Sequence, residues 1–152
     1  MSDINLIINK ISDGMFGERL KILYGNKPGV ISKQKERYLM AIENFKFIFS
    51  GKKDVELFST PGRTEVGGNH TDHNAGRILA AAVNLDIIAV VAKNEENIVR
   101  VKSEGYPEDI IDINELMPKE NEKYTSAALI RGVCARLKEL GYKIGGFEAY
   151  TT

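Results

Sequence analysis

Residues suited to binding a sugar and a phosphate group gather in one stretch, from Pro61 to Arg77. Arg63 carries a permanent positive charge and a fork of hydrogen-bond donors that suits phosphate. Farther along, three side chains alternate as donors and acceptors for hydroxyl groups: Asn69, His70 and Asp72. Glycines at positions 62, 67, 68 and 76 allow backbone N–H groups to approach a ligand closely. The stretch therefore predicts a site for a hydroxyl-rich ligand beside an arginine able to meet phosphate.

This stretch resembles the N-terminal signature of galactokinases, whose superfamily also holds homoserine, mevalonate and phosphomevalonate kinases. The resemblance is carried by Pro61-Gly62-Arg63 and by the segment from Gly68 to Gly76. The family pattern runs roughly Pro-Gly-Arg-Val-Asn-Leu-Ile-Gly-Glu-His-Thr-Asp-Tyr-Asn-x-Gly, and its His-Thr-Asp core separates galactokinases from the mevalonate-type members. The similarity covers most of the chain after about Asp54.

The resemblance implies a kinase that uses ATP and Mg²⁺ to phosphorylate galactose at its anomeric hydroxyl. It assigns Arg63 to the transferring phosphoryl group and assigns sugar binding to Asn69, His70, Thr71 and Asp72. Ser103 is a candidate contact to the nucleotide, although a serine at the turn after a strand has an equally good structural explanation. The family's phosphate loop and catalytic aspartate would fall after position 152, so we expect negligible kinase activity from these residues alone.

The sequence also departs from the family pattern at the site. Asn69 stands where galactokinases usually carry glutamate, and His73 stands where they carry tyrosine. Residues 65–67 replace an Asn-Leu-Ile run. These changes bear on which sugar is bound and on the hydroxyl contacted at position 69, and they leave Arg63, His70 and Asp72 as the family has them.

Other interpretations remain open on the residues alone. A non-catalytic galactose-binding or sensing protein of the same family would carry the same signature. A truncated chain with an open sheet edge could pair with a second copy. Asp72 could serve an Asx-type turn. A zinc site is disfavoured, because the chain offers two histidines and one distant cysteine, Cys134.

The composition is that of an ordinary globular domain. The chain has 152 residues, of which 43% are hydrophobic and 28% charged, with 21 basic and 21 acidic side chains. This balance gives no overall field that would attract nucleic acid or an anionic membrane. The single cysteine excludes a disulfide framework, and we expect Cys134 to be a small buried hydrophobe. With no signal sequence and no run of about 20 apolar residues, we expect a cytoplasmic protein.

Hydrophobic periodicity predicts an α+β fold, a mixed β-sheet with helices packed on it. The resemblance implies that this fold is the N-terminal domain of a galactokinase-like two-domain kinase. We expect residues 1–152 to be one incomplete sugar-binding domain with a helical extension over about residues 1–52. One helix follows a cap at Ser2 or Asp3, and its apolar stripe reaches Met15. A second helix follows Ser32 and buries a stripe of four residues, Tyr38, Ile42, Phe45 and Phe49.

The remaining pattern predicts a sheet and one more helix. We expect a strand over residues 55–60, a loop from Pro61, and short strands at 78–82 and 85–92 separated near Asn84. Residues 93–97 should connect a hairpin to a strand at 98–102, and residues 105–123 should be mostly irregular. Thr125 or Ser126 should cap a helix ending at Leu140, and residues 146–151 should form a last strand. The predicted buried face of that helix consists of Leu129, Ile130, Val133, Leu137 and Leu140.

Overall fold

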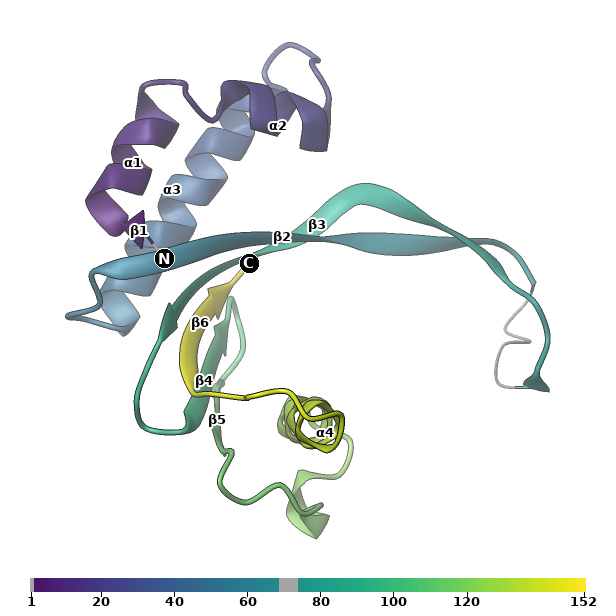
Figure 1. The fold of residues 1–152 in the computed structure, drawn as a ribbon. Coiled ribbons are helices and arrows are strands. Elements are labelled where there is room, and N and C mark those ends of the chain that lie inside the picture. Colours follow the sequence, from purple (N-terminus) through teal and green to yellow (C-terminus); the bar gives the residue numbers. More distant parts are fainter. Residues whose placement is uncertain (1, 69–73) are drawn as a thin grey trace.

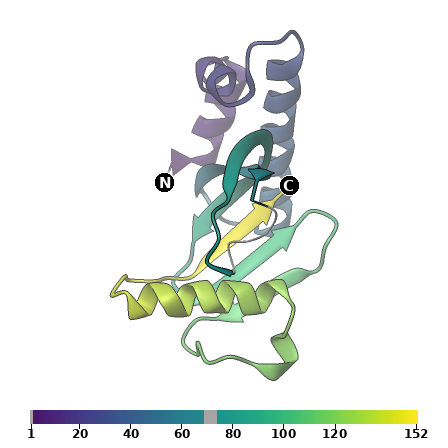
Figure 2. The same cartoon turned by 90° about the vertical axis from the view of Figure 1, so that its right-hand side faces the viewer.

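A β-sheet is the central layer of the computed structural model, which describes residues 2–68 and 74–152. Helices from the first fifty residues cover one face of the sheet, and a later helix covers part of the other face (Figure 1). Figure 2, turned by 90°, shows the same separation of the helices. Two neighbouring strands extend beyond this body as a long hairpin (Figure 1). The predicted α+β class, with a mixed sheet, is confirmed.

The elements succeed one another as β1 (Ser2–Asp3), α1 (Ile4–Ser12), α2 (Gly17–Tyr24), α3 (Val30–Ile48), β2 (Asp54–Gly67), β3 (Leu79–Lys93), β4 (Ile98–Ser103), β5 (Glu108–Asp112), η2 (Glu120–Glu122), α4 (Ser126–Glu139) and β6 (Phe147–Thr151). Polar side chains fix two helix starts, because each accepts a hydrogen bond from a backbone N–H group that has no partner within the helix. Asp3 caps α1 and Thr125 caps α4, both as predicted.

The strands of the described residues lie in the order β1-β2-β3-β6-β4-β5. β4 and β6 are parallel, and the other neighbours are antiparallel. A parallel pair needs a long crossover connection, which here includes β5 and α4. Because β6 lies between β3 and β4, the predicted hairpin through residues 93–97 is wrong.

One face of the sheet packs against α1, α2 and α3. The predicted aromatic stripe of α3 is confirmed, because its four side chains are buried in this core. Residues that alternate along β3 complete the core from the sheet side: Ile88, Val90 and Ala92. The first fifty residues therefore form a full layer of the domain.

The opposite face packs partly against α4. Adjacent residues of a strand point to opposite faces, and along β6 Tyr150 joins the first core whereas Phe147 packs against the second. The second core is small, with Val99 and Ile111 at its centre. Cys134 lies partly buried against it, and this burial raises the pKa of its thiol. No helix in the described ranges is long and apolar enough to cross a bilayer.

Three expected boundaries are wrong. β2 continues through the predicted loop to Gly67, and β3 continues through Asn84 without a break. Each strand supplies hydrogen-bond partners for the other, so cross-strand pairing outweighs the local turn preferences of proline, glycine and asparagine. In addition, β5 occupies part of the segment expected to be irregular. The first helix ends at Ser12 and does not reach Met15, which is exposed, and the helix α2 that follows it was not predicted.

The predicted buried face of α4 is wrong except at Ile130, which packs against the second core. Leu129 is 71% exposed and Val133 is 53% exposed, whereas Arg131 is buried at 3%. Arg131 donates to both carboxylate oxygens of Glu122 at 2.7 Å, to the carbonyl of Asp112 at 3.0 Å and to the carbonyl of Glu115. These hydrogen bonds replace those that the Arg131 guanidinium would form with water, so this side of α4 can be buried. The helix therefore packs through Ile130 and Cys134 and leaves most of its leucine stripe exposed.

Two neighbouring alanine substitutions on α4 test this orientation. Leu129→Ala should change the free energy of unfolding by less than about 0.5 kcal/mol, because the side chain is already in water. Ile130→Ala should cost about 1–2 kcal/mol, because this partly buried side chain packs against the second core. Urea unfolding measures both changes, and a larger loss for Leu129→Ala than for Ile130→Ala would contradict the structure.

Candidate functional site

One residue of the predicted site, Arg63, lies on a projecting arm, which we define as residues 62–67 of β2 and 79–85 of β3. The two strands pair from Glu56 with Val91 outward to Gly67 with Leu79. All residues of the arm are exposed except the half-buried Val83. The arm therefore carries its residues away from both cores, as Figure 1 shows for the outer part of β2 and β3.

A break in the strand register marks the base of the arm. Pro61 pairs with Asp86, and the next regular pair joins Arg63 to Ala82, so the register shifts between positions 61 and 63. Proline has no N–H group to donate to a neighbouring strand, and it is accommodated in sheets at edges and irregularities of this kind. The predicted corner at Pro61-Gly62-Arg63 is thus an irregularity within β2.

Close backbone approach restricts two glycines, Gly62 within the arm and Gly68 directly after its first strand. A Cβ atom at Gly62 would lie 3.1 Å from the carbonyl oxygen of Leu85. At Gly68, which adopts a φ of +121°, a Cβ atom would lie 2.7 Å from the Cα atom of Ile78. Both the left-handed backbone and the lack of space exclude larger residues at position 68.

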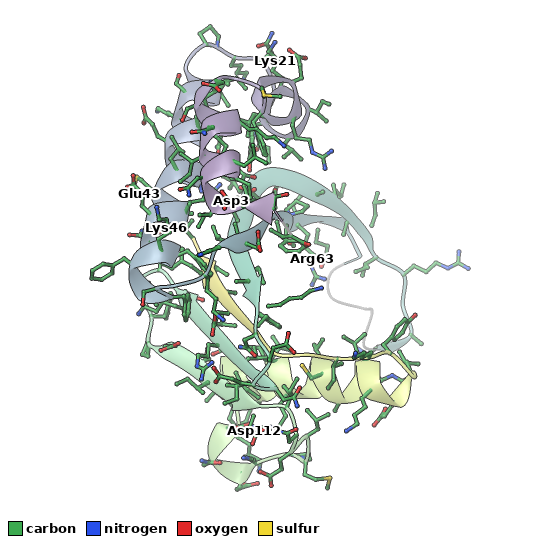
Figure 3. All side chains as sticks on the ribbon, turned by 60° about the vertical axis from the view of Figure 1, so that its left-hand side comes forward. Asp3, Lys21, Glu43, Lys46, Arg63 and Asp112 are labelled. Carbon is green, nitrogen blue, oxygen red and sulfur yellow. The ribbon has the colours of Figure 1, made fainter. Side chains whose placement is uncertain are left out.

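Arg63 lies on β2 just beyond the register break, and its side chain is exposed. In Figure 3 it lies on the side of the arm toward α4. The guanidinium forms no ion pair with any residue in the described ranges. It is therefore accessible to an anionic ligand.

The predicted sugar-binding residues lie outside the described residues. In the sequence, Asn69, His70, Thr71 and Asp72 fall between Gly68 and Asn74, after β2 and before β3. The structure fixes the two flanks of this stretch, Gly68 and residues 74–78. The roles of the four residues stay predictions.

A buried polar cluster stands at the base of the arm. The carboxylate of Asp86, with its side chain 4% exposed, accepts hydrogen bonds from the hydroxyls of Tyr24 at 2.5 Å and Ser59 at 2.6 Å. Arg37 forms an ion pair with the same carboxylate at 2.5 Å. Its other terminal nitrogen donates to the backbone carbonyls of Asp86 at 2.7 Å and Thr152 at 2.9 Å. The cluster joins α2, α3, β2, β3 and the end of β6.

The cluster holds Asp86 in its charged form. Burial by itself would raise the pKa of this carboxyl, but hydrogen bonds from Ser59 and Tyr24, together with the ion pair to Arg37, bring the pKa below its usual value. The pKa of Tyr24 is raised strongly by burial and by its hydrogen bond to Asp86. The tyrosine therefore stays a neutral donor and the aspartate stays an acceptor.

Acid should weaken the fold through this carboxylate. Because the folded-state pKa of Asp86 lies below the value of about 3.9 for an exposed aspartate, its ionised form stabilises the fold fully above that value. This contribution is lost as the pH falls through the folded-state pKa. We expect the wild-type chain to lose more unfolding free energy than Asp86→Asn between roughly pH 5 and pH 2. Urea titrations across that range measure the difference, and equal losses would contradict the assignment.

Ser103 is the last residue of β4 and is not part of the arm. Its hydroxyl accepts a hydrogen bond of 2.9 Å from the hydroxyl of Thr151 on the parallel neighbour β6. It also lines an open groove with Tyr106 and Tyr124. The hydrogen bond gives this serine a structural role, and its contact to a nucleotide stays a prediction.

Comparison with known proteins finds a family model that matches the part of the chain containing the arm. Residues 43–93, which run from the end of α3 through β2 and β3, match the model of the galactokinase galactose-binding signature. The resemblance to galactokinases is confirmed. The matched segment contains both strands of the arm and the stretch between them. The segment that matches the galactokinase signature thus includes the whole arm.

Galactokinases from several bacteria are similar over a longer part of the chain. The galactokinase of Lactococcus lactis subsp. lactis is 33% identical over 110 residues, which are 70% of this chain and 27% of the relative. That of Fusobacterium nucleatum is 33% identical over 109 residues, covering 70% and 28%. The chain thus spans about a quarter of the length of these curated relatives.

A solved structure supports the fold. The crystal structure of Lactococcus lactis galactokinase complexed with galactose superposes with a TM-score of 0.65 and 29% sequence identity, covering 76% of this chain and 30% of that one. The fold of the mixed sheet and its helices is therefore similar to part of that galactokinase.

The cluster around Asp86 was not predicted from the sequence. One signal for it was available: Asp86 is a single charged residue within the apolar run from Leu85 to Ala92. A carboxylate in such a position is normally paired when it is buried. The sequence does not indicate which residues pair with Asp86, because Tyr24 and Arg37 are distant from it in the chain.

Proposed function

We propose that this chain is the galactose-binding part of a galactokinase-like sugar kinase, which transfers the terminal phosphoryl group of ATP to the anomeric hydroxyl of galactose. The observation that carries the proposal is the match of residues 43–93 to the galactokinase galactose-binding signature. The exposed arm supports it, because a sugar at its end would be accessible from solvent.

In this proposal Arg63 acts on the phosphoryl group. Phosphoryl transfer is catalysed mainly by positioning and by positive charge near the oxygens that gain negative charge. The exposed guanidinium of Arg63, which has no ion-pair partner among residues 2–68 and 74–152, is suited to that role. Its place beside the register break fixes its backbone at a defined point on β2.

The sugar would be bound by the residues at the end of the arm. A carboxylate at Asp72 can accept hydrogen bonds from two neighbouring hydroxyls, and His70, Thr71 and Asn69 add donors and acceptors. Asn69 replaces the family's glutamate, so one charged acceptor becomes a neutral amide. We propose galactose as the ligand, with a changed contact at position 69.

ATP and Mg²⁺ would serve the complete reaction. The family's phosphate loop and catalytic aspartate have no counterpart within residues 1–152, and Ser103 is the one candidate nucleotide contact proposed in this chain. We therefore propose that these 152 residues bind the sugar without turning over ATP. This behaviour would also suit a non-catalytic galactose sensor of the same family.

Calorimetric titration of the 152-residue chain with galactose tests the proposed function. We expect binding by the wild-type chain and its loss in Asp72→Ala. Asp13→Ala, which removes an exposed carboxylate at the end of α1, is the matched control and should bind as the wild type does. A second titration with ATP and Mg²⁺ should show no turnover. A folded wild-type chain without affinity for galactose would contradict the proposal.

A further inference from the structure

Beyond its base, the arm is exposed along its described length except at the half-buried Val83. Beyond Asp86, residues 62–67 are all exposed, and the paired segment 79–85 buries no residue fully. Neither arm segment, residues 62–67 of β2 or residues 79–85 of β3, contributes a side chain to either hydrophobic core. The direction in which the arm leaves the body is therefore determined by the contacts at its base.

Asp86 occupies that base. It is the register partner of Pro61, at the break after which the pairing resumes with Arg63. Its carboxylate also holds Ser59, which lies two positions before Pro61 on β2. Asp86, which itself belongs to β3, thus also holds β2 at the point where both strands join the arm.

Helices α2 and α3 hold the carboxylate in turn. Tyr24, at the end of α2, and Arg37, on α3, approach the same carboxylate at 2.5 Å. Tyr24 also lies 3.0 Å from the hydroxyl of the buried Tyr38. Arg37 is further bound to the carbonyl of Thr152, which accepts a second hydrogen bond from the N–H group of Ile88. The base of the arm is thereby connected to the helical layer and to the end of β6.

We propose that Asp86, with Arg37, Tyr24 and Ser59, is a positioning group that sets the orientation of the arm, and with it the position of Arg63, for the binding of the sugar. This inference rests on the proposed function, because it assigns the ligand of the arm to galactose. The group acts through the backbone of β2 and β3 and does not touch the sugar itself. Directional hydrogen bonds to one buried carboxylate suit this task better than apolar contacts, which tolerate small rotations.

Two variants of the cluster and one control test the proposal. Asp86→Asn removes the charge and keeps the size of the side chain, and Ser59→Ala removes a single donor with little change in volume. Glu148→Gln is the matched control. Glu148 is likewise a buried carboxylate that faces two cations, Lys52 at 2.8 Å and Arg100 at 3.3 Å. It pairs with Ala92, near the end of β3 remote from the arm.

We expect Asp86→Asn to raise the dissociation constant for galactose about tenfold, the effect of losing one charge-assisted hydrogen-bond network, and Ser59→Ala to raise it about threefold. Both variants should speed hydrogen exchange at the paired amides of residues 59–67 and 79–88, with no change in β4, β5 or α4. Glu148→Gln should lower the melting temperature and leave the galactose affinity and the exchange of the arm unchanged.

The two measurements separate the inference from the proposed function. Wild-type affinity and wild-type exchange of the arm in both Asp86→Asn and Ser59→Ala would overturn the positioning role, even if both variants melt earlier. If the wild-type chain binds no galactose, the proposed function fails, and unchanged exchange in the arm then overturns the positioning of the arm on its own.

Discussion

Asp86→Ala is expected to lower the free energy of unfolding by about 2–4 kcal/mol, one of the two largest effects that the structure predicts. The substitution removes the common acceptor of Tyr24, Ser59 and Arg37, and leaves their donors facing a cavity. Breaking a fully buried ion pair costs about 3–5 kcal/mol, and we place the loss lower because Arg37 is 27% exposed and keeps some contact with water.

Urea denaturation at neutral pH measures this loss. Glu139→Ala is the control, because the ion pair between Glu139 and Arg136 on α4 is exposed on both sides and should contribute little. A loss for Asp86→Ala no larger than that of the control would show that the cluster does not stabilise the fold.

Gly68→Ala should have the largest effect on sugar binding outside the residues proposed to contact the sugar. The added methyl group would lie 2.7 Å from the Cα atom of Ile78, and the residue would have to keep a φ of +121°. Backbone strain of this kind costs about 1–3 kcal/mol, and the flanks of the stretch from Asn69 to His73 would have to separate. We expect the dissociation constant for galactose to rise at least about tenfold.

The neighbouring glycine provides a matched control. A Cβ atom at Gly67 would meet no atom within 4 Å. Gly67→Ala should therefore bind galactose as the wild type does. Calorimetric titration compares the two variants, and equal affinities would contradict the account of the arm.

The candidate site could be proposed from the sequence because its chemistry is local. Arg63 and the His70-Thr71-Asp72 core lie within one short stretch, and the signature match covers that stretch. The same holds for α3, whose buried stripe follows helical spacing within a single element. Both predictions depend only on neighbours along the chain.

The predictions that failed depend on contacts between distant residues. The leucine stripe of α4 suggested a buried face, but Glu122 and two backbone carbonyls satisfy Arg131 and turn that side of the helix inward. The position of β6 between β3 and β4 follows from a crossover connection that no local pattern specifies. The partners of Asp86 likewise come from α2 and α3.

The most direct test of the account is to observe which residues respond when the 152-residue chain binds galactose. Backbone amide chemical shifts can be followed by NMR as the sugar is added. The account predicts that the shifts change along residues 61–82, with the largest changes next to the His70-Thr71-Asp72 core, while α1, α4 and β5 stay unchanged. Shifts confined to another surface, or none at saturating galactose, would contradict the claim that the end of the arm is the galactose site.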